Sequence, residues 1–265
     1  MQEVLNKAAP FISGSPPREL NMLLVAGPKD HGPGEHDYPA WQKAWKPLLE
    51  KSEAVKVDTA FKWPTKEQWE AARIAAFFLA NEWTEAQLRD VDEFLARGGG
   101  VVLIHMSVIP KGDAAPLAAR IGLAWQHRKT KYRHGHLELK IASPDDPIVR
   151  GLPEKIRFVD ESYWPLVEGD MKQVTVLATA VEDGAAQPMV WTRSPEKGRV
   201  FCSILGHYSW SLDDPFFRLL LLRGISWAAG EHVHRLDALA TDGVALRNDP
   251  AVVRDERAGA GIQRE

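Results

Sequence analysis

Apolar runs alternate with segments of helical spacing through the first hundred residues of the chain. Leu20–Ala26 is a short apolar run that ends at Gly27-Pro28, which predicts a buried strand. Residues 38–51 place large apolar residues near helical spacing, and residues 55–58 alternate as a strand does. Two capping-box pairs predict the starts of further helices, Thr65 with Gln68 and Thr84 with Gln87. Further strands are expected at 74–80 and 101–105. The order β-α-β-α-β-α-β favours a parallel sheet with helices on both faces.

From residue 137 onward, short β-like segments replace this alternation. They lie at 137–141, 156–159, 174–177, 189–192 and 199–205. A last helix is expected from Pro215 to about residue 229, capped by Asp213 or Asp214 and stopped by Gly230. We therefore expect an α/β fold with an open, mostly parallel sheet and added β-strands in the C-terminal half.

The length of 265 residues suits one large α/β domain. Residues 1–19 show no sustained period and are expected to be a leader or linker. Residues 20–235 form the single domain. Residues 236–265 are polar and poor in large apolar groups, so we expect a C-terminal tail on the surface.

Composition and charge argue against several classes of partner. The formal net charge is -3, and no basic block is long enough to suggest binding to nucleic acid. The basic segment 127–134 is expected to be a solvated loop. No stretch reaches the ~18 apolar residues of a membrane span, and no nucleotide-binding motif is present. The N-terminus lacks a signal-peptide pattern, so the cytoplasm is the default location, with an exported mature form left open. The single cysteine, Cys202, lies in an apolar run and is expected to be a buried, unreactive thiol.

Four of the nine histidines fall where a parallel sheet would bring them together. His31 and His36 follow the first strand, and His105 and His207 end two later ones. Ligands of open α/β sheets bind at the carboxyl ends of the strands, so these positions predict a functional site. The alternative for each is a histidine that only hydrogen-bonds nearby backbone.

Two further segments carry candidate chemistry. The loop at 30–39 holds two histidines and three carboxylates, which suit zinc or another divalent metal, or hydrogen bonds to sugar hydroxyls. His31 and His36 are five residues apart and do not form a helical chelate, so a metal there needs ligands from other loops. Asp160 and Glu161 follow a predicted strand and offer a general acid or base beside two aromatic residues, although a solvated turn is also possible. Neighbours on a strand point to opposite faces, so only one of the two carboxylates need face the site.

Other polar residues are weaker candidates. Ser107 lacks the flanking glycines of a nucleophile elbow. His134 and His136 flank Gly135 near a strand, and their structural and functional roles stay open.

Several blocks of the chain together resemble the trehalose-utilisation (ThuA-like) family over about residues 20–230. They are DHGPGEHDYPAW at 30–41, GGGVVLIH at 98–105, DESYW at 160–164 and GRVFCSILGHY at 198–208. The resemblance implies a flavodoxin-like fold of the class I glutamine amidotransferase-like superfamily. It also implies a role in the breakdown of trehalose and related disaccharides through 3-keto sugars. By block matching, His105, Glu161 and His207 are the recurrent polar positions. The cysteine of true glutamine amidotransferases would fall at 105–107, where this chain has none, so thiolate glutaminase chemistry is excluded.

The resemblance, together with the positions of the histidines, implies an enzyme of carbohydrate catabolism that acts on a disaccharide or 3-keto-sugar by hydrolysis, elimination or isomerisation. His105 and His207 would move protons, and Glu161 would act as a base or orient them. The substrate is expected to be a small carbohydrate, and nucleic acid and membranes are not expected partners. A non-catalytic sugar-binding or sensing domain is the first alternative, and a structural protein on the same fold is the second. The expected substrate-binding residues are His36, Asp160, Tyr163, Trp164 and Tyr208, and the expected ligands of a zinc or manganese ion are His31 and His36.

Overall fold

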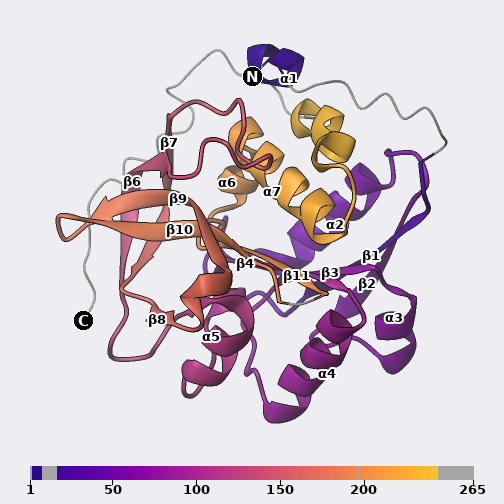
Figure 1. The fold of residues 1–265 in the computed structure, drawn as a ribbon, viewed down its shortest axis with the longest axis horizontal. Coiled ribbons are helices and arrows are strands. Elements are labelled where there is room, and N and C mark those ends of the chain that lie inside the picture. The colour runs from indigo at the N-terminus through magenta and orange to yellow at the C-terminus, as the bar shows by residue number, and fades with distance from the viewer. Residues whose placement is uncertain (1, 8–16, 196, 244–265) are drawn as a thin grey trace.

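A nine-stranded sheet crosses the molecule in the computed structural model, which describes residues 2–7, 17–195 and 197–243 (Figure 1). The strand order is β2-β1-β3-β4-β11-β10-β9-β6-β7. The first five strands in this order are mutually parallel, and each later strand pairs antiparallel with its neighbour. The parallel strands are β1 (Leu20–Ala26), β2 (Val55–Phe61), β3 (Ile74–Phe78), β4 (Gly100–Ile104) and β11 (Arg199–Ser203). The antiparallel strands are β6 (Lys131–Ile141), β7 (Lys155–Trp164), β9 (Val174–Glu182) and β10 (Ala185–Arg193).

The parallel half has the flavodoxin-like strand order, with β11 in the fifth place. Strand β11 comes late in the chain because the antiparallel strands are inserted before it. The expected open α/β sheet with added strands in the C-terminal half is therefore confirmed. A separate two-stranded ladder joins β5 (Leu123–Ala124) to β8 (Val167–Glu168).

Helices cover both faces of the parallel half (Figure 1). On one face lie α2 (Tyr38–Leu49), α6 (Ser209–Asp213) and α7 (Pro215–Ala228). On the other lie α3 (Lys66–Ala71), α4 (Glu85–Ala96) and α5 (Ala115–Ile121). Both capping boxes are formed, because the Thr65 and Thr84 side chains each accept from the backbone three residues on while Gln68 and Gln87 reach back. Asp214, not Asp213, caps α7.

The C-terminal boundary of the domain differs from the expected one. The short helix η3 (Val233–Thr241) packs on α7, and Leu236 is fully buried, so the domain continues past residue 235. A buried ion pair between Arg223 and Asp237 joins the two helices, at 2.9 Å. Residues 244–265 of the expected tail lie outside the described residues, as do residues 8–16 of the expected leader. Within that leader, Gln2–Lys7 form α1.

Two segments expected to be loops or turns are strands instead. The DESYW block belongs to β7, and half of the basic segment 127–134 belongs to β6. These two strands pair along their whole length, so cross-strand hydrogen bonds extend both beyond their apolar cores.

Cys202 is fully buried on β11, as expected, and burial raises the pKa of its thiol well above the ordinary value. In the described part of the chain, no helix is long and apolar enough to cross a membrane.

Candidate functional site

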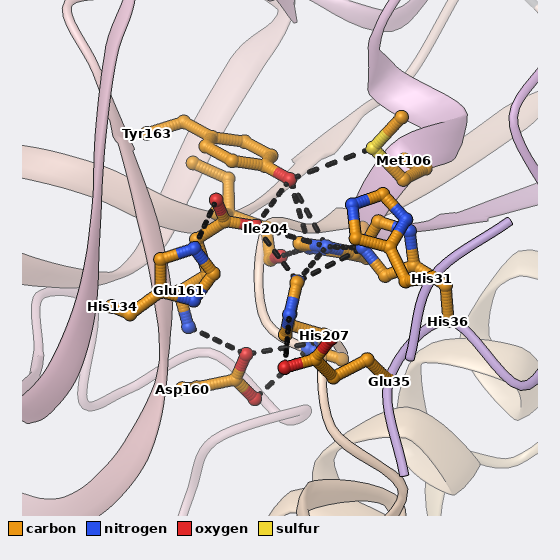
Figure 2. A network of polar contacts seen from close by, with 12 residues as sticks. His31, Glu35, His36, Met106, His134, Asp160, Glu161, Tyr163, Ile204 and His207 are labelled. Atoms are coloured by element: carbon orange, nitrogen blue, oxygen red, sulfur yellow. Dashed lines mark hydrogen bonds and ion pairs between the residues drawn. The ribbon is translucent and has the colours of Figure 1, made fainter. Parts of the chain in front are cut away.

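Three histidines and one glutamate converge at the carboxyl edge of the parallel strands. Nε2 of His36 lies 2.9 Å from Nε2 of His105 and 2.9 Å from Nδ1 of His207. Oε2 of Glu161 lies 3.2 Å from the same nitrogen of His105 and 3.0 Å from that of His207 (Figure 2). All four side chains are buried. We call this set the His–Glu cluster: His36, His105, His207 and Glu161.

The backbone is strained where it delivers these side chains. His105 follows the last residue of β4, begins the short helix η1 (His105–Val108), and has φ of 51°. His36, in the loop after β1, has φ of 43°. Non-glycine residues rarely adopt positive φ, and such strain is concentrated at functional sites. His105 therefore occupies a strand-to-helix turn like the one at which α/β-hydrolases place a nucleophile.

Hydrogen bonds on the outer side of two rings fix which nitrogen faces the cluster. Nδ1 of His36 lies 2.9 Å from a carboxylate oxygen of Asp30, and Nδ1 of His105 lies 2.6 Å from the carbonyl oxygen of Ile204. Burial raises the pKa of Asp30, but hydrogen bonds from His36 and His31 outweigh it and lower the pKa to about 2. Asp30 is thus an acceptor at neutral pH, so both Nδ1 atoms carry hydrogens and both Nε2 atoms face inward.

Burial and neighbouring charges act on the cluster in opposite directions. Burial lowers the pKa of His36 to about 3, so this imidazole is neutral at pH 7. Burial also lowers the pKa of His105, but Glu161 outweighs it, and the net pKa is raised. Burial raises the pKa of Glu161, but hydrogen bonds from His105 and His207 lower it by more. The net pKa lies well below the ordinary value, so this carboxyl is ionised.

Strand β7 supplies both a cluster residue and its supports. Glu161 and Tyr163 point into the site, and the Tyr163 hydroxyl donates to Oε2 of Glu161 at 2.9 Å (Figure 2). Asp160 accepts from the backbone N–H groups of Gly206 and His207, at 3.0 Å each. Asp160 therefore positions the loop that carries His207. Of the two neighbouring carboxylates, only Glu161 faces the histidine rings of the cluster.

Trp164 and His31 were expected in the site, and neither contributes a side chain to the centre of the cluster. Trp164 points away from it, and its Nε1 donates to Asp183 in the turn between β9 and β10, at 2.8 Å. Trp164 points away because β7 extends to this residue. Side chains alternate along a strand, so Trp164 lies on the face opposite to Tyr163. The side chain of His31 lies at the edge of the site and is 43% exposed, and its ring centroid lies 3.7 Å from that of His36 with the two rings tilted by 52°. The structure brings His31 and His36 together, and it also brings His36 to His105 and His207.

Sequence reasoning missed His134 as a site residue. This histidine of β6 is paired directly with Glu161 of β7, and its Nε2 lies 3.3 Å from Oε1 of that carboxylate. Its Nδ1 lies 3.1 Å from the hydroxyl of Tyr208, and the side chain is 27% exposed. His134 thus connects the buried cluster to the surface.

Aromatic rings continue outward from the cluster at the same edge. Ring centroids follow one another at 6.1, 5.8, 6.1 and 4.1 Å from Trp125 through Tyr132, His134 and Tyr208 to Trp210. All of these rings except that of Tyr208 are half-buried. We call this series the aromatic rim: Trp125, Tyr132, His134, Tyr208 and Trp210.

Ser107 has a structural role. Its hydroxyl accepts from the backbone of Leu79 and lies 3.0 Å from the carbonyl oxygen of Phe77. The hydroxyl is therefore engaged by the end of β3, as its sequence context led us to expect.

The fold and the site define an α/β protein with a buried histidine–carboxylate centre at the carboxyl edge of its sheet. A model of the ThuA family, described as trehalose utilisation, matches residues 24–228, and the chain belongs to this family. No curated protein matches it.

Solved structures share this fold at low sequence identity. A protein described as ThuA-like from Parabacteroides merdae is 22% identical, with a TM-score of 0.63 over 80% of this chain and 91% of that chain. Another from Bacteroides uniformis is 16% identical, with a TM-score of 0.63 over 83% and 95%. A cytoplasmic protein from Salmonella typhimurium is 15% identical, with a TM-score of 0.53 over 79% and 99%.

Proposed function

We propose that this protein is an enzyme of carbohydrate catabolism that acts on a disaccharide or a 3-keto-sugar. The observation that carries the proposal is the His–Glu cluster, in a chain of the trehalose-utilisation family. Burying four ionisable side chains together costs stability, and perturbed groups of this kind gather at active sites.

The cluster is suited to polarise an oxygen of a sugar. Each of its histidines presents a single nitrogen inward, and Glu161 adds a negative charge. Nε2 of His105 can donate to the carbonyl oxygen of a keto-sugar when that imidazole is protonated, and Glu161 can accept a proton from a water that attacks an acetal.

Proton exchange is assigned to Glu161 and His134. One oxygen of Glu161 faces the cluster and the other faces His134, which reaches the surface. Hydrolysis, elimination and isomerisation of sugars all require a base and an acid, and this pair offers a path between the buried centre and solvent. His105 and His207 were expected to transfer protons. Each has one nitrogen that faces the cluster, Nε2 of His105 and Nδ1 of His207, and only that nitrogen can exchange a proton with a bound substrate.

The aromatic rim supports a carbohydrate as the substrate. Flat, half-buried rings fit the apolar C–H faces of a sugar, while the polar groups of the cluster fit its hydroxyl and carbonyl oxygens. In this role Trp125 and Tyr132 take the place expected for Trp164. We place the activity in the cytoplasm, in line with the description of the Salmonella typhimurium neighbour.

Turnover of trehalose and 3-keto-trehalose by the purified full chain tests the proposal. We expect release or rearrangement of sugar by the wild type and a loss of about 100-fold or more in kcat for Glu161→Gln. His136→Ala is the matched control, since His136 is an exposed histidine two residues from His134 on the same strand. This control should retain the wild-type rate.

The alternatives give different results in the same experiment. Calorimetric binding of these sugars without turnover would identify a sugar-binding or sensing domain. Absence of both binding and turnover would contradict the proposal and favour a structural role.

A further inference from the structure

We propose that the His–Glu cluster binds one divalent first-row transition-metal ion. The ligand atoms are Nε2 of His36, Nε2 of His105, Nδ1 of His207 and Oε2 of Glu161. This inference deepens the proposed function, because it names what the same site holds. Its evidence is the geometry of the donor atoms, and it can be tested without a substrate.

The cluster contains five short contacts among its nitrogen and oxygen atoms, and too few hydrogens lie between these atoms for every contact to be a hydrogen bond. Nδ1 of His36 lies 2.9 Å from a carboxylate oxygen of Asp30 and carries the hydrogen of that contact, so Nε2 is left as an acceptor. That atom nevertheless lies 2.9 Å from nitrogens of both His105 and His207, which are themselves 3.2 Å apart. Oε2 of Glu161, another acceptor, lies 3.2 Å from the nitrogen of His105 and 3.0 Å from that of His207. A cation among these atoms satisfies all of their lone pairs at once.

The outer side of the cluster has the arrangement that holds metal-binding histidines in place. Such histidines donate their other N–H to a carboxylate or a backbone carbonyl, which fixes the ring and its tautomer. Asp30 takes this role for His36, and the carbonyl of Ile204 takes it for His105. For His207, the buried Nε2 has no hydrogen-bond partner among the described residues, and Glu35 lies 3.9 Å from it.

The spacing of the donor atoms matches an ion with ligands at right angles. With bonds of about 2.1 Å, neighbouring ligand atoms lie about 3.0 Å apart, and opposite ones about 4.2 Å apart. Five of the separations are 2.9–3.2 Å. The pair His36 and Glu161 is wider, within 4.8 Å. This pattern places His36 and Glu161 on opposite sides and leaves two adjacent positions of an octahedral ion for oxygens of water or sugar.

The donor set favours particular ions. Imidazole nitrogens suit zinc, iron and nickel, whereas magnesium and calcium prefer oxygen ligands only. An ion of this class polarises a sugar carbonyl or acidifies a bound water when it is present.

A second group of donors in the same loop provides the competing location. Asp30, His31 and His36 also come within 4.8 Å of one another, but Asp30 and His31 are exposed. An ion there would need Nδ1 of His36, which already faces Asp30.

Metal content and affinity of the full chain test the inference. The protein is stripped with a chelator and reloaded with Zn²⁺, Mn²⁺ or Co²⁺. Bound metal is measured by elemental mass spectrometry, and affinity by calorimetry. We expect one ion per chain and, for Co²⁺, an absorption spectrum of histidine-ligated, six-coordinate cobalt. Glu161→Gln should weaken binding by about 100-fold or more, beyond the usual effect of an outer hydrogen bond. His136→Ala and His31→Ala should bind as the wild type does.

Several outcomes would overturn the inference. Failure of the folded wild type to bind any of the three ions would do so, whatever the variants show. Retention of metal by Glu161→Gln with loss in His31→Ala would place the ion in the Asp30 loop. If Glu161→Gln does not fold by circular dichroism, His207→Gln takes its place. Turnover by a wild type that binds none of the three ions would overturn the metal site and leave the proposed function standing. Bound metal without turnover would do the reverse.

Discussion

Backbone strain at single residues supports the geometry of the site. Beside the positive φ of His36 and His105, Gly206 has φ of 128° just before His207. A Cβ at this glycine would lie 2.9 Å from Cγ2 of Ile104 and 3.5 Å from Cβ of His105. The turn at His105 and the loop of His207 therefore fit together because position 206 has no side chain.

Substitution of this glycine should destabilise the fold and disturb the site together. We expect Gly206→Ala to lower the free energy of unfolding by about 2–3 kcal/mol, since it adds both strain and a close contact. The matched control is Gly184→Ala, where φ is 77° and nothing lies within 4 Å of the added Cβ. There only the backbone conformation is unfavourable, at about 1 kcal/mol. Urea unfolding followed by tryptophan fluorescence measures both, and equal losses would contradict the close fit at 206.

Asp30 acts on the cluster through His36, without being part of it. We expect Asp30→Asn to weaken binding of Co²⁺ by roughly 10–100-fold, because the orienting carboxylate is lost while every proposed ligand remains. Calorimetric titration of both proteins gives the ratio. A variant with wild-type affinity would show that the Asp30 contact does not orient the ring.

At the level of single elements, β7 determines which aromatic side chain serves the site. Glu161 and Tyr163 lie on one face of the strand and contact each other. On the opposite face, Ser162 donates to Glu182 and Trp164 donates to Asp183. Alternation along one strand thus separates two neighbouring aromatic residues by role.

Two conservative substitutions distinguish these roles. Tyr163→Phe removes the hydroxyl that donates to Glu161 and should lower kcat by about 10–100-fold on whichever sugar the wild type converts. Trp164→Phe removes the hydrogen bond to the exposed Asp183 and part of a buried ring that faces away from the cluster, and it should leave kcat unchanged. A larger effect of Trp164→Phe would mean that the substrate extends along the far face of β7.

The sequence predicted elements well where the signal is local. Apolar runs placed the parallel strands, and Thr65 and Thr84 marked the starts of their helices. The strand-end positions of His36, His105 and His207 were enough to predict that they meet. His134 was not predicted as a site residue because its contact with Glu161 depends on the register between β6 and β7, and no local sequence pattern specifies that register. Trp164 was misplaced because hydrogen bonding to β6 carries β7 beyond its apolar core.

At the scale of the whole molecule, the segment after α7 is part of the folded body. The guanidinium of Arg223 is fully buried, and Asp237 of η3 accepts from it at 2.9 Å and 3.1 Å. Carbonyl oxygens of Ile148 and Arg150 accept from its Nη1. This contact links η3, α7 and the segment between β6 and β7.

Removal of this carboxylate should leave an uncompensated charge in the interior. We expect Asp237→Ala to lower the free energy of unfolding by about 3–5 kcal/mol. Asp242→Ala is the control, because it breaks an exposed ion pair with Lys51 and should change stability by less than about 1 kcal/mol. Urea unfolding of both variants measures the contrast. Similar small losses would show that η3 contributes little to the domain.

The position of the single thiol makes it a reporter of how the two halves of the sheet separate. Cys202 lies on β11, paired with Leu103 of the parallel half on one side and Trp191 of the antiparallel half on the other. Because it is fully buried, a thiol reagent reaches it only after strands on one side have opened. The rate of labelling under native conditions therefore measures how often β11 separates from β4 or from β10, the seam between the two halves of the sheet. We expect a ligand that holds His105 and Glu161 together across the seam to slow the labelling.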